Sequence, residues 1–215
     1  MATQVVTQNV QPFRPLTLSQ LKDLSLPQLE AVVESLLFLG TLTLFAAREK
    51  SGKSLLMIDL ICSVALDEPF LGRAVRAGPV VYVPAEDNLR DVRDRLNRRL
   101  GGRDGPIHVL PVNGYTEDAL RLDDPASLAR LRAMIEEIEP VLVVLDPMRE
   151  LHTRREDVAD EMGPMLRPLR QIAHETNTAV ILNHHMSKGG SARGSTAITA
   201  AVDQIWTFHL HDPGG

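Results

Sequence analysis

One stretch in the first third of the chain constrains the fold more than any other, because it joins a strand pattern, a short polar loop and a helix pattern. Residues 41–46 (TLTLFA) are apolar and β-prone, which predicts a buried strand. Residues 53–66 (KSLLMIDLICSVAL) combine helix-forming residues with apolar spacing on one face. Between them, Gly52-Lys53-Ser54 matches the end of the pattern Gly, any four residues, Gly-Lys-Ser/Thr. The stretch therefore predicts a phosphate-binding loop.

The spacing suits an anion for a physical reason. A loop between a strand and a helix turns backbone N–H groups toward one point, and the helix N-terminus adds the positive end of its dipole. We expect Lys53 to reach the β- and γ-phosphates of a nucleotide and the Ser54 hydroxyl to bind Mg²⁺. The predicted nucleotide-binding residues are Ala47, Arg48, Glu49, Lys50, Ser51, Gly52, Lys53, Ser54 and Leu55. The alternative is a chance Gly-Lys-Ser at the start of an ordinary helix, which the flanking patterns argue against.

Two residues of this loop depart from the usual pattern. Ala47 stands where the pattern has its first Gly. We therefore expect that the backbone at this position needs no positive φ. Glu49 is an acid beside a polyanion site, so its side chain is expected to point outward.

Composition limits the class of protein. A chain of 215 residues with 44% hydrophobic and 24% charged residues suits one globular α/β domain. A net charge of −5 argues against a nucleic-acid-coating protein, although it leaves a local basic stripe open. The single cysteine, Cys62, excludes an intrachain disulfide and is expected to be buried filler. Without a secretory pattern or a membrane-length apolar run, we expect a cytoplasmic location and no membrane partner.

The rest of the chain alternates strand and helix patterns, which predicts an α/β three-layer sandwich around a mostly parallel sheet. The expected strands are residues 41–46, 79–83, 107–112, 141–145, 179–182 and 202–210. Residues 31–215 form the expected core, and residues 1–30 a partly disordered lead-in. Leucines over residues 16–39 favour short helical pieces, which pack either on their own domain or on a neighbour. A long helix around residues 158–172 is expected to kink at Gly163-Pro164.

Several polar residues fall at the ends of these strands, where ligands of parallel sheets bind. Asp146 follows the apolar run VLVVL and is expected to hold Mg²⁺. Glu86 ends the second strand and is a candidate base toward a water that attacks the γ-phosphate, or else a surface acid that caps the next helix. His184 and His185 end the fifth strand; one of them is a candidate γ-phosphate sensor, and a buried core histidine is the alternative.

A Gly/Ser-rich loop follows the two histidines. Lys188 and Arg193 bracket it, so the loop could place a positive side chain on a γ-phosphate or on a nucleic-acid backbone. The alternative is a solvated glycine loop.

The order of these motifs resembles a known family. The chain is similar to the RecA-like ATPases, and within them to the hexameric plasmid replicative helicases of the RepA type. The segments that carry the resemblance are residues 33–37 (VESLL), 47–54 (AREKSGKS), 80–87 (VVYVPAED), 141–152 (VLVVLDPMRELH), 181–188 (ILNHHMSK) and 193–203 (RGSTAITAAVD).

The resemblance implies an Mg²⁺-dependent ATPase. It implies Glu86 as the hydrolytic base, Asp146 at Mg²⁺, and His184 as γ-phosphate sensor with His185 as the alternative. It also implies that Lys188 and Arg193 act in trans on the ATP of a neighbouring subunit, in a homo-oligomer such as a hexameric ring. The expected function is then a DNA helicase or motor on single-stranded DNA in replication. The alternative is a nucleotide-dependent regulatory or DNA-binding module with little turnover.

Overall fold

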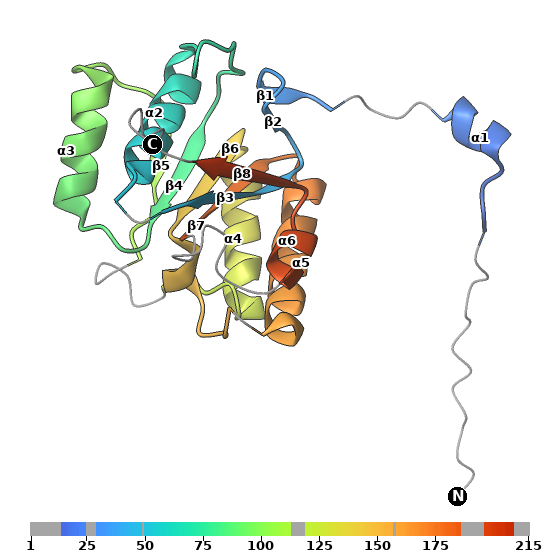
Figure 1. Cartoon of the computed structure of the whole chain (residues 1–215). Helices are drawn as coiled ribbons and strands as arrows, with labels where there is room; N and C mark the ends of the chain where they lie inside the picture. Colours follow the sequence, from blue (N-terminus) through green and yellow to red (C-terminus); the bar gives the residue numbers. More distant parts are fainter. Residues whose placement is uncertain are drawn as a thin grey trace, which may run out of the picture.

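The computed structural model describes residues 14–24, 29–48, 50–112, 119–156, 158–185 and 196–208, and it shows an α/β sandwich (Figure 1). The strands are β1 (Ala31–Val33), β2 (Leu37–Phe38), β3 (Leu42–Ala47), β4 (Val80–Pro84), β5 (Ile107–Val109), β6 (Leu142–Asp146), β7 (Ala179–His185) and β8 (Gln204–Phe208). The helices are α1 (Leu18–Asp23), α2 (Lys53–Leu66), α3 (Leu89–Leu100), α4 (Pro125–Ile138), the 3-10 helix η1 (Met148–Leu151), α5 (Ala159–Glu175) and α6 (Thr196–Ala200).

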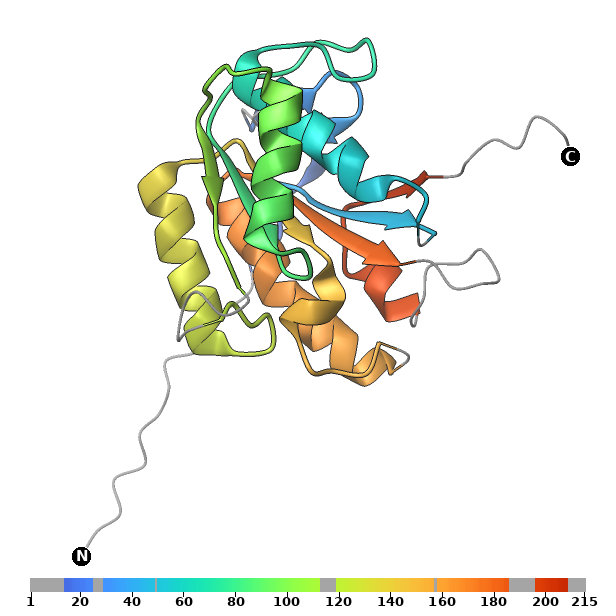
Figure 2. The ribbon, with the colours of Figure 1, turned by 90° about the vertical axis from the view of Figure 1, so that its left-hand side faces the viewer.

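Six strands form one sheet in the order β5-β4-β6-β7-β3-β8, and every neighbouring pair is parallel. Helices α2 and α3 cover one face, and α4 and α5 cover the other (Figures 1 and 2). The α/β class and the parallel sheet that the sequence predicts are confirmed. All strand carboxyl ends therefore meet at one edge, and the loop between β3 and α2 lies there.

The strands are buried on both faces because alternate side chains enter two different cores. On β6, Val143 and Leu145 join the core under α4 and α5, whereas Leu142 and Val144 join the core under α2 and α3. All five residues of β6 are buried, which explains its continuous apolar run. Any polar side chain at the end of such a strand is therefore held in place by packing on both sides.

Local sequence signals set the ends of the helices. The Asp124 carboxylate accepts hydrogen bonds from the backbone N–H groups of Ala126 and Ser127, and Pro125 occupies the first turn of α4. Gly101 ends α3 in the left-handed conformation. Helix α5 continues through Pro164 and Pro168.

The lead-in differs from the expectation in part. The segment expected to be helical up to residue 39 contains the antiparallel hairpin β1–β2, in which Val33 pairs with Leu37. Ser35, at φ 57°, makes the turn between them. The hairpin packs on its own domain, with Val32, Val33 and Leu37 fully buried, whereas α1 buries no residue. β-branched residues at 32 and 33 suit a pleated, half-covered surface better than a helix.

Two predicted strands differ at their bounds, because β5 ends at Val109 and β8 begins at Gln204; residues 209 and 210 of the second prediction lie outside the described residues. Cys62 is buried as expected, and burial raises the pKa of its thiol to about 11, so the thiol stays protonated near neutral pH. Across the described ranges, no helix combines the length and the apolar character needed to cross a membrane.

Candidate active site

The loop between β3 and α2 has the geometry of a phosphate cradle. Gly52, at φ 86°, precedes the first residue of α2. The Ser51 hydroxyl donates a hydrogen bond to the Arg48 carbonyl oxygen at 2.7 Å, which closes the loop into a turn. Ala47 is fully buried at the end of β3 and is not among the residues with positive φ, as expected for a position without Gly. Glu49 lies outside the described residues.

Lys53 is the buried cation of this loop. Its side chain lies at the start of α2, and the residue is only 7% exposed. The ammonium Nζ is 3.0 Å from Nδ1 and 3.1 Å from Nε2 of His185. Because an ammonium group can only donate, the contact suits a neutral imidazole. The register explains the meeting, since His185 pairs with Ala47 in the parallel ladder of β7 and β3.

Asp146 is the buried anion opposite this cation. It ends β6 and is 5% exposed. Its Oδ1 accepts a hydrogen bond from Asn183 Nδ2 at 2.5 Å, and its Oδ2 accepts one from the Tyr82 hydroxyl at 3.4 Å. Burial raises the pKa of Asp146, while the positive charge of Lys53 and a hydrogen bond from Ser54 act in the opposite direction.

The same residues fit a magnesium ion. The Ser54 hydroxyl lies near enough to the Asp146 carboxylate to act on its pKa, so two hard oxygen ligands stand close together at the mouth of the loop. Magnesium in nucleotide sites takes one or two protein oxygens and completes its shell with phosphate oxygens and water. The protein donors present are therefore the kind and number that such an ion needs.

Glu86 lies just beyond β4, on the same edge of the sheet. The Ala85 N–H donates to the Asp146 carbonyl oxygen at 2.7 Å, so the ends of β4 and β6 are tied together. Glu86 is exposed, which leaves its carboxylate accessible from solvent. Its neighbour Asp87 forms an ion pair with Arg95, and its charge contributes to the raised pKa of Asp146.

The two histidines of β7 point to opposite faces of the sheet. His185 contacts Lys53, as described above, whereas His184 is 1% exposed and its Nδ1 is 3.9 Å from Glu156 Oε1. The structure thus brings His185, rather than His184, to the phosphate loop. Lys188 and Arg193 lie outside the described residues. The Leu55 side chain is 60% exposed, so only its backbone can belong to the cradle.

Asn183 and Tyr82 are two site residues that the sequence analysis does not single out. Both contact Asp146 and both are buried. Alternation along β7 would have placed Asn183 on the same face as His185, had the predicted strand extended beyond Leu182. Tyr82 gives no comparable signal, because a tyrosine in an apolar strand is usually an ordinary core residue.

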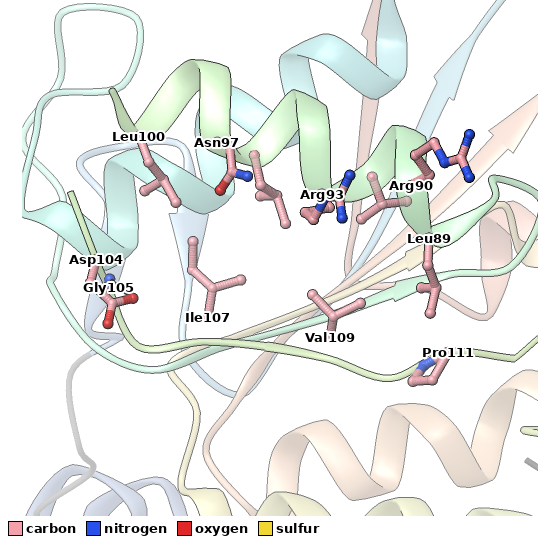
Figure 3. A pocket seen from close by; sticks show the side chains of 12 residues that line it. Leu89, Arg90, Arg93, Asn97, Leu100, Asp104, Gly105, Ile107, Val109 and Pro111 are labelled. Carbon is pink, nitrogen blue, oxygen red and sulfur yellow. Dashed lines mark hydrogen bonds between the residues drawn. The ribbon is translucent and has the colours of Figure 1, made fainter. Parts of the chain in front are cut away.

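A groove of about 570 Å³ lies away from this site, between α3 and the edge strand β5 (Figure 3). Leu100 of α3 faces Ile107 of β5 across it, and Leu96 and Val109 also line it. None of its lining residues belongs to the phosphate loop or to the ends of β6 and β7. It is therefore a separate apolar feature of the surface.

A strand, a glycine turn and a helix that begins with Lys-Ser, set at the carboxyl edge of a parallel sheet beside a buried Asp, define a RecA-like P-loop ATPase domain. The chain belongs to the AAA domain family, whose model matches residues 7–191.

Curated relatives with the same segment are DNA repair proteins named RadA. The chain is 24% identical over 191 residues to the protein of Pseudomonas aeruginosa, covering 87% of this chain and 37% of that one. It is 23% identical over 170 residues to the protein of Escherichia coli, covering 76% and 31%. The chain thus spans about a third of the length of these relatives.

Solved structures show the same fold at low identity. A KaiC-like protein from Pyrococcus horikoshii superposes with a TM-score of 0.59 at 18% identity, covering 85% of this chain and 77% of that one. The flagellar accessory protein FlaH from Methanocaldococcus jannaschii superposes with a TM-score of 0.55 at 15% identity, covering 86% and 84%. At these identities the likeness concerns the fold alone.

Proposed function

We propose that this domain binds ATP with Mg²⁺ and hydrolyses it. The observation that carries the proposal is the meeting of Lys53, Ser54 and Asp146 at the N-terminus of α2. A buried cation and two oxygen donors for a metal converge there on the place where the loop turns its backbone N–H groups. Membership of the AAA domain family supports the same chemistry.

The chain's own groups act mainly by position and charge. Lys53 and the loop backbone would bind the phosphate oxygens, with the α2 N-terminus adding its dipole. Bound Mg²⁺, held by Ser54 and Asp146, would neutralise charge on the β- and γ-phosphate oxygens. Asn183 and Tyr82 would keep the Asp146 carboxylate oriented, since each donates a hydrogen bond to one of its oxygens.

Glu86 is the proposed base toward water. Its exposed carboxylate follows β4 at the sheet edge shared with Asp146, where it can orient a water beside the γ-phosphate. We assign the γ-phosphate contact from β7 to His185, because His185 is the histidine that reaches Lys53. His184 faces the opposite side of the sheet.

A finer proposal concerns assembly. Lys188 and Arg193 would act in trans on the ATP of a neighbouring subunit, within a homo-oligomer such as a hexameric ring that moves on single-stranded DNA. The similarity to RadA proteins supports a role in DNA metabolism. The alternative is a nucleotide-dependent regulatory or DNA-binding module with little turnover. Self-association, and stimulation of turnover by single-stranded DNA, separate the two.

Nucleotide binding is tested with two matched lysine variants. Lys53→Met removes the buried cation, so the affinity for a non-hydrolysable ATP analogue should fall at least about tenfold, as expected for the loss of a charged hydrogen-bond partner. Lys22→Met removes an exposed lysine of α1 and should leave the affinity unchanged. Calorimetric titration in the presence of Mg²⁺ measures both. Equal affinities for Lys53→Met and the wild type would remove the basis of the proposal.

A further inference from the structure

Two buried histidine side chains and one half-buried glutamate side chain meet at the end of β7, on the face of the sheet away from the phosphate loop. They belong to His152, which follows η1, to Glu156, and to His184 of β7. Glu156 Oε1 is 3.6 Å from His152 Nε2 and 3.9 Å from His184 Nδ1. The side chains of the two histidines are 0% and 1% exposed, and that of Glu156 is 17% exposed. One carboxylate thus stands between two imidazoles.

The carboxylate of this trio is held in its charged form. Burial raises the pKa of Glu156, but the close approach of His152 and the nearby charges of His184 and Arg149 outweigh it, so the pKa is lowered. Burying a charge is costly unless partners compensate it. The two imidazoles therefore supply the compensation, and their positions depend on the carboxylate in return.

A metal ion is not the best reading of the trio. No group of three His, Cys, Asp or Glu side chains in the described ranges converges closely enough to hold one. The position of the trio matters because His184 belongs to strand β7.

Strand β7 carries the site on its other face. Val180 and Leu182 enter the core under α4 and α5, as His184 does by alternation, whereas Ala179 and Ile181 enter the core under α2 and α3. By the same alternation, Asn183 and His185 point toward α2, where they contact Asp146 and Lys53. Three consecutive residues thus link the trio to both charged groups of the phosphate site.

We propose that Glu156 is a positioning residue for the phosphate site, acting through His184. It fixes the His184 ring on one face of β7 and thereby the backbone of residues 183–185. That backbone in turn sets where Asn183 meets Asp146 and where His185 meets Lys53. The expected effect on nucleotide binding rests on the proposed function. The expected effect on the placement of Asn183 and His185 does not.

The geometric part is tested without nucleotide. Histidine ring signals of the full chain are recorded by NMR and assigned with His184→Asn and His185→Asn. Glu156→Gln keeps the size of the side chain and removes its charge, and the ring signals of His185 should move although Glu156 contacts only the other two histidines. The control Glu150→Gln removes an exposed charge of η1 and should leave His185 unmoved.

Unmoved His185 signals in Glu156→Gln would overturn the inference, whatever happens to His152 and His184. If Glu156→Gln does not fold, Glu156→Asp takes its place, because it keeps the charge and only shortens the reach. The His185 signals should then move as well, and their coincidence with the wild type would count against the inference in the same way.

Nucleotide binding gives the second readout. In Glu156→Gln the affinity for a non-hydrolysable ATP analogue should fall about tenfold, as for the loss of other outer partners of a site, with ADP affected much less. If Glu156 had a merely structural role, Glu156→Gln would weaken the binding of both nucleotides equally, and that result would contradict the inference. A wild-type chain that binds neither nucleotide would instead refute the proposed function and leave the NMR result to decide the positioning.

Discussion

Gly52 shows how one residue sets the phosphate loop. Its φ of 86° lies in the left-handed region, and a Cβ built there would meet nothing within 4 Å. A side chain would thus be opposed by backbone conformation and not by lack of space. The first Gly of the usual pattern is dispensable here because Ala47 sits in an ordinary strand.

Gly52→Ala should lower the free energy of unfolding by about 1–2 kcal/mol, the cost of holding an L-residue in the left-handed region. Gly163→Ala is the matched control, because Gly163 lies inside α5 with open space around its Cβ position. That change should raise stability by about 0.5–1 kcal/mol. Urea unfolding measures both, and changes of the same sign would show that backbone conformation does not decide the effect.

At the scale of residues, the sequence identifies the loop and Asp146 but does not separate the two histidines. The predicted strand ended at Leu182, so alternation could not assign His184 and His185 to faces. The observed β7 reaches His185, which settles their sides. The trio with Glu156 could not be predicted, since His152 and His184 lie far apart in sequence and meet only through tertiary packing.

Among elements, one carboxylate adds to the ladder that holds β8 on β3. Asp203 Oδ2 accepts a hydrogen bond from the Leu42 N–H at 2.9 Å, and its Oδ1 accepts one from Arg170 Nε at 2.9 Å. Burial raises the pKa of Asp203, but these two partners outweigh it and hold the pKa below its ordinary value. The residue thus joins the starts of β3 and β8 to α5.

Asp203→Ala should lower the free energy of unfolding by about 2–3 kcal/mol, because hydrogen bonds to a charged group are lost. Asp94→Ala, in an exposed pair with Arg93, should cost less than about 1 kcal/mol. Since the folded pKa of Asp203 is lowered, its contribution is complete above the unfolded pKa of about 3.9 and is lost as pH falls through the folded pKa. Chemical unfolding should therefore give a similar difference in unfolding free energy between the wild type and Asp203→Ala at pH 7 and near pH 4. The difference should narrow only at lower pH, and its disappearance at pH 6 would contradict this explanation.

The lead-in shows why short elements escape sequence analysis. Strands β1 and β2 have three and two residues, too few for a period of two to stand out from a leucine pattern. Burial distinguishes the two parts of this segment, since Leu37 is fully buried and Leu21 is 46% exposed.

Leu37→Ala should therefore destabilise the domain by about 2–5 kcal/mol, as for other buried leucines. Leu21→Ala changes a helix that buries nothing and should shift stability by less than about 0.5 kcal/mol. Thermal and urea unfolding compare them. A large loss in Leu21→Ala would mean that α1 packs against protein in solution.

For the molecule as a whole, the parallel sheet explains why so much could be predicted. Alternating strand and helix patterns imply parallel strands, and parallel strands imply that every carboxyl end meets at one edge. The chemistry found there, from Lys53, Ser54 and Asp146, follows from that topology. The sheet order and the groove beside β5 could not be predicted, because they depend on contacts between segments distant in sequence.

ATP turnover shows directly whether this loop is a site of hydrolysis; it is measured for the wild type with and without Mg²⁺, beside Lys53→Met and Glu86→Gln. We expect turnover that requires Mg²⁺ and that is lost together with nucleotide binding in Lys53→Met. In Glu86→Gln, turnover should fall by a factor of about 10²–10⁴ while nucleotide binding persists. Turnover that is independent of Mg²⁺, or unchanged in Lys53→Met, would contradict the assignment of this loop and of Asp146 as the site of hydrolysis.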